Sequence, residues 1–414
     1  QLRAVDQVND EVVNEAFHQD ADVYVFVEIG SGYLGVIERN LPDKTCIVID
    51  HHPPSREAPS RLLHVNPHLF GIDGAKELSG AGAAYLVAKG IDVKNMDLSP
   101  LAVVGALGDS QDQGEKFSFL GLNQEIVHDA TNIGHLEVKT DLLFYGRETR
   151  PIHKSIAHTT NPFLPGISAE EDQCLSLLKS CGIPLKEDEK WRTIADLTNE
   201  EKQSLLSRII ESVTRRGVKG EVALRLIGNV YILTDEEKAT PTRDAREYAS
   251  LLNACGRMNK QSIAIAIGLG ERATTLEQAQ SVVSDYRRNL ARYMSWLSKN
   301  VDRRQLFKRL DVVRAEGAIE ERMTGVFSSI LLSSGLAERG KAVVVVAETK
   351  DSMVKLSARI PDELLRVGVD LGDSMQTLAG QFRGAGGGHG AAAGARISRT
   401  DLDEFLLELS LIHI

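Results

Sequence analysis

The stretch 45-TCIVIDHH-52 and the similar stretch 23-VYVFVEIGSG-32 together decide the fold. Each is a continuous run of β-branched and aromatic residues that ends in acidic residues, histidines or glycines, a pattern typical of strands buried on both faces of a sheet. A short helical stretch around residues 34–39 joins them. Strand, helix and strand form a right-handed unit with parallel strands. We therefore expect an α/β fold in which Glu28 and residues 50–52 share the ligand-binding edge of a parallel sheet.

A third acidic group follows a helix in the same part of the chain. The apolar run LAVVGAL over residues 101–107 predicts a helix that ends at Asp109. Carboxylate and imidazole groups at one sheet edge suit a divalent cation such as Mn2+ or Mg2+. Convergence of Glu28, His51 and Asp109 therefore predicts a metal site, although the three letters DHH alone fit a structural or surface group as well.

The chain has 414 residues, enough for two to three domains. We expect a parallel-sheet domain over 1–139 and a mostly helical middle region over 140–310. A smaller α/β domain follows over 311–408, with neighbouring strands at 341–347 and 353–357 and a glycine-rich loop at 384–394. The last residues, 409–414 (LSLIHI), resemble a translated sequencing adapter, and we expect a non-biological tail there.

A second group of residues in the third domain suits a phosphate. Consecutive glycines, Gly386, Gly387 and Gly388, allow backbone N–H groups to approach an anion, and His389 adds a donor. Arg359 lies two residues after Ser357 on the same strand face and offers a bidentate contact. A plain glycine-rich turn and an exposed arginine remain alternatives for these residues.

Composition narrows the function classes. The apolar runs are too short for a membrane helix and the first residues are no signal sequence, so we expect a soluble, cytoplasmic protein without a membrane partner. Its four cysteines lack the spacing of a zinc site. The formal net charge of −10 opposes non-specific coating of nucleic acid. Residues 287–314 nevertheless hold nine basic and two acidic residues, either a nucleic-acid track or a solvated helix face.

These motifs carry a family resemblance. The order of DHH, GDSQD and GGGH resembles the DHH phosphoesterase superfamily with its DHH-associated domain. The segments VEIGSGYL, HVNPHLFGIDG, ELSGAGAAYLVAKG, GRETRPIHKSIAHTTNPFLPGI and TRDAREYASLLNACGRM resemble the archaeal RecJ-like branch of single-strand-specific exonucleases. The resemblance covers nearly all of residues 1–408 and implies a hydrolase that cleaves phosphodiester bonds of single-stranded DNA or RNA from an end, with two divalent ions, Mn2+ or Mg2+.

The resemblance also implies a role for each site residue. Glu28 takes the place of a bridging aspartate, His51 and Asp109 match metal ligands, and His52 matches the histidine nearer the scissile phosphate. Asp50 matches the motif as a residue that orients the histidines rather than as a ligand. In the associated domain, the matching substrate-binding residues are Ser357, Arg359, Gly386, Gly387, Gly388 and His389.

Two departures keep other functions open. The Asp-x-Asp motif of the family's first strand is absent, because the chain begins after its place, so we expect the chain as given to be inactive or nearly so. Glu28 is longer than aspartate by one methylene, which favours a non-catalytic replication component that binds the GINS complex. A phosphodiesterase for oligonucleotides or cyclic dinucleotides is a further alternative, opposed by the large middle region.

Overall fold

The computed structural model describes residues 2–5, 8, 10–17, 21–159, 162–217, 219–334, 336–349 and 352–411. The chain divides into two compact units. The first comprises residues 1–253 and 264–271, and the second comprises residues 254–263 and 272–414. Each unit is described by itself below. Within the described residues, no helix has both the length and the apolarity that crossing a membrane requires.

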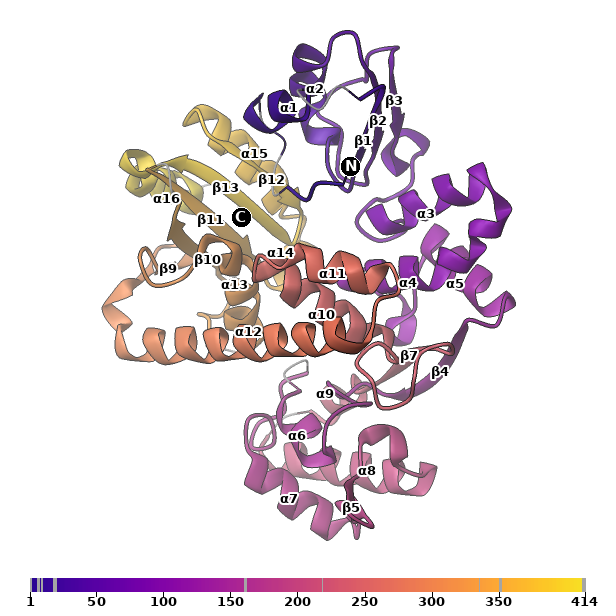
Figure 1. Ribbon diagram of the computed structural model, residues 1–414. Coiled ribbons are helices and arrows are strands. Elements are labelled where there is room, and N and C mark those ends of the chain that lie inside the picture. Colours follow the sequence, from indigo (N-terminus) through magenta and orange to yellow (C-terminus); the bar gives the residue numbers. More distant parts are fainter. Residues whose placement is uncertain are drawn as a thin grey trace. The chain divides into compact units, whose positions relative to one another are not determined.

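The first unit begins with a three-stranded parallel sheet in the order β1-β2-β3, of which the sequence predicted the parallel pair β1 and β2 but not β3. β1 (Val23–Val27) and β2 (Thr45–Ile49) have the predicted bounds, and β3 is Leu62–Val65. Val27 pairs with Ile49, so both strands end at the same level and Glu28 and Asp50 follow at one sheet edge. α1 (Asp10–Phe17) and α2 (Leu34–Asn40) lie on one face of this sheet (Figure 1).

The sequence predicted strands that are buried on both faces, but the opposite face of β1 is exposed. The side chains of Val23, Val25 and Val27 are 47, 53 and 47% exposed, so β1 is covered on one face and not on both. The covered face carries Tyr24, which packs in the core with the α2 residues. A continuous apolar run predicts a strand correctly, but it does not reveal which of its faces is covered.

A group of small-residue helices follows. It consists of α3 (Gly80–Ile91), α4 (Ser99–Gly108) and α5 (Gly121–Asn132). α3 and α4 pack closely because Gly105 lacks a side chain: a Cβ there would lie 2.3 Å from the Cβ of Ala81. α4 is almost entirely buried, and its C-cap residue is Asp109, as predicted.

The middle of the chain is an insertion on a two-stranded ribbon. β4 (Leu136–Leu142) pairs antiparallel with β7 (Ile227–Leu233). Between them lie α6 (Ile152–Ala157), α7 (Glu171–Ser180), α8 (Asn199–Arg215), α9 (Glu221–Leu224) and the short strands β5 (Lys186–Glu187) and β6 (Lys190–Trp191). These helices enclose their own apolar core. After β7 follow α10 (Ala245–Arg257) and α11 (Gln261–Gly268).

Buried charged residues join this insertion to α10. The side chain of Glu247 accepts hydrogen bonds from the backbone N–H of Glu148 and the hydroxyl of Thr149, both at 2.7 Å. Burial and the neighbouring carboxylate of Asp244 raise the pKa of Glu247 to about 8. The insertion is thus fixed to α10 through a carboxylate whose charge depends on pH near neutrality.

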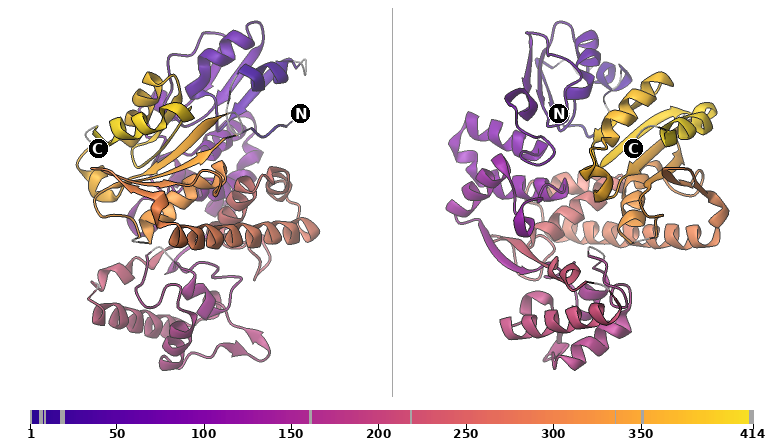
Figure 2. Two further views of the ribbon diagram at one scale, coloured as in Figure 1. Left: turned by 90° about the vertical axis from the view of Figure 1, so that its left-hand side faces the viewer. Right: turned by 180° about the vertical axis from the view of Figure 1, so that it is seen from behind.

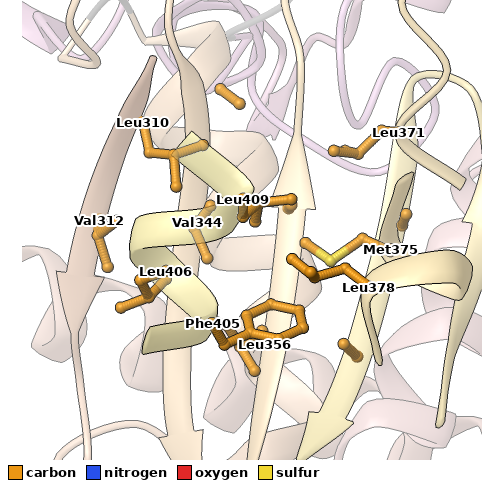
Figure 3. Packing of buried hydrophobic residues seen from close by; sticks show 14 of the residues in the cluster. Leu310, Val312, Val344, Leu356, Leu371, Met375, Leu378, Phe405, Leu406 and Leu409 are labelled. Carbon is orange, nitrogen blue, oxygen red and sulfur yellow. The ribbon is translucent and has the colours of Figure 1, made fainter. Parts of the chain in front are cut away.

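The second unit is built on a six-stranded mixed sheet in the order β12-β13-β11-β10-β9-β8. Its strands are β8 (Arg304–Leu306), β9 (Leu310–Arg314), β10 (Ala342–Glu348), β11 (Met353–Arg359), β12 (Ala385–His389) and β13 (Ala392–Ser398). α15 (Leu371–Gln381) and α16 (Leu402–Leu411) cover one face through Met375, Leu378 and Phe405 (Figure 3). α12 (Ala273–Lys299) and α13 (Thr324–Ser333) pack on the other face, and α14 (Asp362–Arg366) follows β11.

Two sequence expectations concern this unit, the glycine-rich loop at 384–394 and the tail at 409–414. The glycine-rich segment is not a loop: residues 385–389 and 392–398 form the antiparallel pair β12 and β13. Gly387 and Gly388 have φ angles of 154° and 145°, an extended backbone that glycine adopts readily. The expected tail falls partly in α16, where Leu409 is buried, while residues 412–414 lie outside the described part of the chain.

Candidate functional site

The site begins where β1 ends, at Glu28. Its backbone N–H donates to the carbonyl of Ile49 at 2.9 Å, which ties the ends of β1 and β2 together. Its φ of 66° lies in the left-handed region, which is uncommon outside glycine and turns the chain sharply. The carboxylate lies directly over the first turn of α3: a Cβ on Gly80 would lie 1.5 Å from Oε2 of Glu28. Gly80 therefore makes room for this carboxylate.

His51 lies at the end of β2 and is fully buried. Its Nδ1 lies 2.6 Å from the carbonyl oxygen of Gly74. Because a carbonyl only accepts, Nδ1 carries a proton and donates it. Its Nε2 lies 3.2 Å from Oε1 of Glu28 and 3.7 Å from Oδ2 of Asp109. Burial disfavours the charged ring, but these carboxylates outweigh it and raise the pKa of His51 to about 9.

Asp109 is held by residues that the sequence analysis missed. Nε2 of Gln111, a fully buried side chain, donates to Oδ2 of Asp109 and to the carbonyl of Gly74, both at 2.8 Å. Oε1 of Gln111 accepts from Nδ2 of Asn123 at 2.6 Å. Burial raises the pKa of Asp109, partly offset by the charge of His51. Gln111 thus connects Asp109 to the same carbonyl that orients His51.

Asp50 lies between the two histidines and is 1% exposed. Its Oδ1 accepts from the backbone N–H of His51 and from Nδ1 of His52, both at 2.8 Å, and its Oδ2 accepts from the backbone N–H of Ser31 at 2.9 Å. Burial alone would raise its pKa, but the contacts to His52 and Ser31 hold the pKa of Asp50 well below its usual range. Asp50, His51 and His52 offer ligand atoms within 4.8 Å of one another.

A polar group behind the DHH residues was also missed. Oγ of Ser31 lies 2.8 Å from Nε2 of His64 and accepts from Nδ2 of Asn66 at 2.8 Å. Asn66 also donates to the carbonyl of His52 at 2.9 Å. The only sequence signal for these contacts is that Ser31 lies in the turn GSG and that Asn66 lies in the segment HVNPHLF.

The structure brings together most of the expected residues of the second unit. Arg359 pairs with Ala392 across β11 and β13, and Ala392 pairs with His389 across β13 and β12. Paired residues on neighbouring strands share a face, so Arg359 and His389 lie on one face, about 10 Å apart at the usual strand spacing. Ser357 and Gly387 occupy the next row on this face, while Gly386 and Gly388 alternate to the other face.

Arg359 is held without a carboxylate partner in the described part of the chain. Its Nε donates to Oγ of Ser329 at 3.0 Å, and its Nη1 donates to the carbonyl of Ala358 at 2.9 Å. Burial and the charge of Arg257 lower the pKa of Arg359. Arg257, which sequence reasoning missed, donates to the hydroxyl of Tyr286 at 3.1 Å. Two neighbouring guanidinium groups of this kind attract an anion.

Two domain models match parts of this chain. The DHH-CID domain model matches residues 144–227, the insertion between β4 and β7, and the DHHA1 domain model matches residues 313–412. An uncharacterized protein of Methanocaldococcus jannaschii is 29% identical over 412 residues, which is 98% of this chain and 84% of that protein.

Two solved structures share the fold. CDC45 from Entamoeba histolytica is 12% identical, with a TM-score of 0.59 over 97% of this chain and 88% of that chain. RecJ from Thermus thermophilus, solved in complex with Mn2+, is 17% identical, with a TM-score of 0.53 over 97% of this chain and 46% of that chain. This chain therefore spans about half of that RecJ. The chain thus contains regions that match the DHH-CID and DHHA1 domain models, and its fold is similar to those of CDC45 and RecJ.

Proposed function

We propose that this protein is a metal-dependent phosphodiesterase that hydrolyses single-stranded DNA or RNA from an end. The observation that carries the proposal is the setting of His51. Its ring is buried, its Nδ1 proton is bound by the carbonyl of Gly74, and its Nε2 faces the carboxylates of Glu28 and Asp109. Once a metal ion displaces the proton on Nε2, this imidazole nitrogen and the two carboxylates form a suitable ligand set for Mn2+ or Mg2+.

The donor set fits a divalent cation because two partly exposed carboxylates face Nε2 of a fully buried imidazole. Glu28, His51 and Asp109 would hold the ion, and Gln111 would orient Asp109. Two ions held there, as the resemblance implies, would supply an activated water and positive charge beside the reacting phosphate. The site residues have to be deprotonated to bind them, so binding is expected to weaken in acid.

Asp50 and His52 act beside the metal ligands. Because the oxygens of Asp50 accept hydrogen bonds from the chain, Asp50 orients the histidines and does not bind the ion itself. Its contact to Nδ1 of His52 leaves Nε2 as the basic nitrogen of a ring that is 42% exposed. In the proposed reaction, His52 contacts the scissile phosphate through this nitrogen.

The substrate-binding role falls to the second unit. Arg359 and His389 share one sheet face, and the small residues between them leave room for a phosphate. The other members are Ser357, Gly386, Gly387 and Gly388. Because β12 is an edge strand, half of its backbone N–H groups are not used by the sheet. We extend this set by Arg257. The division into domains over 1–139, 140–310, 311–408 and 409–414 stays a prediction.

An end-labelled single-stranded oligonucleotide incubated with Mn2+ and a protein that includes the Asp-x-Asp strand tests the proposal. We expect products shortened from one end, no reaction in EDTA, and no reaction for Asp109→Ala with oligonucleotide binding largely retained. Cleavage that is equal with and without metal, or unchanged in Asp109→Ala, would contradict the assignment.

A non-catalytic role in a replication complex, with GINS as partner, is the second candidate. The fold shared with CDC45 and the longer side chain of Glu28 favour it. The fully buried imidazole of His51 beside the carboxylates of Glu28 and Asp109 opposes it, because a scaffold has no need for a buried ring that faces two acidic groups. Mn2+-dependent binding without any cleavage, together with binding of purified GINS, would favour this candidate.

A further inference from the structure

The outer face of α12 carries a row of cations and hydroxyls. From Ser281 to Lys299, the exposed residues of this helix share one stripe. We call this set the α12 stripe: Ser281, Ser284, Arg288, Ala291, Arg292, Ser295, Ser298 and Lys299. None of these eight exposed residues is acidic. Figure 2 shows α12 as one long, unbroken helix.

The stripe does not result from packing. The opposite face of α12 is buried on β9, β10 and α13, with Tyr293 in the core and Leu290 and Leu297 packed against it. In an α-helix, positions separated by four, seven and eleven residues lie on one side. Arg288, Arg292 and Lys299 have this spacing, so the three cations project together from the side opposite the core.

A solvated helix of this acidic protein looks different. On α8, the exposed Arg208 and Arg215 both form ion pairs with Glu211, as expected for a helix face with mixed charges. On the α12 stripe, one cation, Arg288, has an acidic partner, Asp285, and Arg292 stacks near the ring of Tyr293 with 5.3 Å to its centroid. The chain has a net charge of −10, so its overall composition does not explain a helix face on which cations outnumber acidic residues.

We propose that the α12 stripe binds the sugar-phosphate backbone of single-stranded nucleic acid, a binding surface separate from the proposed metal centre. The inference rests on the proposed function for the identity of the strand. Arginine, lysine and serine side chains are the usual partners of phosphate oxygens. Eleven residues separate Arg288 from Lys299, about 16 Å along the helix, which is the axial length of roughly five stacked nucleotides. The contacts carry no base specificity.

The charge-removing variant Arg288→Gln/Arg292→Gln/Lys299→Gln tests this role. Binding of fluorescent dT20 is measured by anisotropy in EDTA over a series of salt concentrations, so that no cleavage occurs. Each lost contact between a protein cation and a phosphate reduces the steepness of log K plotted against log salt concentration by about 0.7. The triple variant should therefore reduce the magnitude of this slope by about 2. Affinity near 100 mM salt should fall at least about tenfold, and equally for dT20 and dA20.

Arg208→Gln/Arg215→Gln/Lys219→Gln is the matched control, because it removes the same exposed charges elsewhere, and its slope should equal that of the unmodified protein. The single variant Arg292→Gln should lower the slope by about 0.7 even if the triple variant folds poorly. An unchanged slope in both α12 variants would overturn the inference. Competition by polyglutamate as strong as by dT20 would also overturn it, in favour of an acidic protein partner. Mn2+-dependent hydrolysis measured separately reports on the proposed function, so each can fail alone.

Discussion

Replacing Gly80 with alanine adds one methyl group where Glu28 has its carboxylate. The new Cβ would lie 1.5 Å from Oε2 and 2.6 Å from Cδ of Glu28, but 3.4 Å from its Cα. The backbone therefore fits, and the carboxylate end has to move by at least about 1.9 Å to reach an ordinary contact distance of about 3.4 Å. That displacement changes the position of a carboxylate whose Oε1 now lies 3.2 Å from Nε2 of His51.

We expect the affinity for Mn2+ to fall by at least about tenfold, because loss of a group that merely orients a ligand already costs tenfold to a hundredfold. Isothermal titration calorimetry with MnCl2 measures it. Gly90→Ala is the control: it lies in the same helix, no atom lies within 4 Å of its built Cβ, and alanine there should stabilise the helix slightly. Equal Mn2+ affinities of the two folded variants would refute the place of Glu28 in a metal site.

Three further predictions follow from other contacts. Gln111→Leu should weaken Mn2+ binding by about tenfold to a hundredfold in calorimetry, because it removes the hydrogen bond to Oδ2 of Asp109. Gln113→Leu, at an exposed position, should leave Mn2+ binding unchanged. Equal effects of the two variants would count against the orienting role of Gln111. Arg359→Gln should weaken oligonucleotide binding by the roughly 1.5 to 3 kcal/mol of a charged hydrogen bond, while Mn2+ affinity stays constant. Normal oligonucleotide binding by this variant at low and moderate salt would exclude a phosphate contact of Arg359. The pKa of Glu247 is raised from the ordinary 4.5 to about 8 in the folded protein. Between these two pH values the folded protein binds more protons than the unfolded protein, so the free energy of unfolding should fall as pH rises. Urea unfolding of Glu247→Gln should show a shallower fall, by up to about 1.4 kcal/mol per pH unit, and identical slopes would contradict the shift.

Short-range patterns predicted β1 and β2, although they did not predict the third strand of the same sheet, β3. Val23–Val27 and Thr45–Ile49 were predicted to the residue, because each continuous apolar run is bounded by polar residues, glycine or proline. The glycine-rich hairpin was missed because glycine provides no side-chain alternation, the usual signal for a strand. The exposed face of β1 was missed because burial depends on what other elements cover, which a local run does not encode.

The candidate site was predicted where backbone topology alone brings residues together. Parallel strands end at one edge, so Glu28 and His51 meet, and α4 brings Asp109 to them. Gln111, Ser31 and the guanidinium of Arg257 were not predicted, because their partners come from segments far apart in the sequence. Side-chain contacts of this kind depend on tertiary packing, for which spacing along the chain gives no rule.

The most direct measurement of the central claim is an anomalous difference map from crystals of the protein soaked in MnCl2. The account predicts a peak within coordination distance of Nε2 of His51 and of one carboxylate oxygen each of Glu28 and Asp109, lost in His51→Ala. A map with no peak at these atoms, or with manganese bound elsewhere and unaffected by His51→Ala, would contradict it.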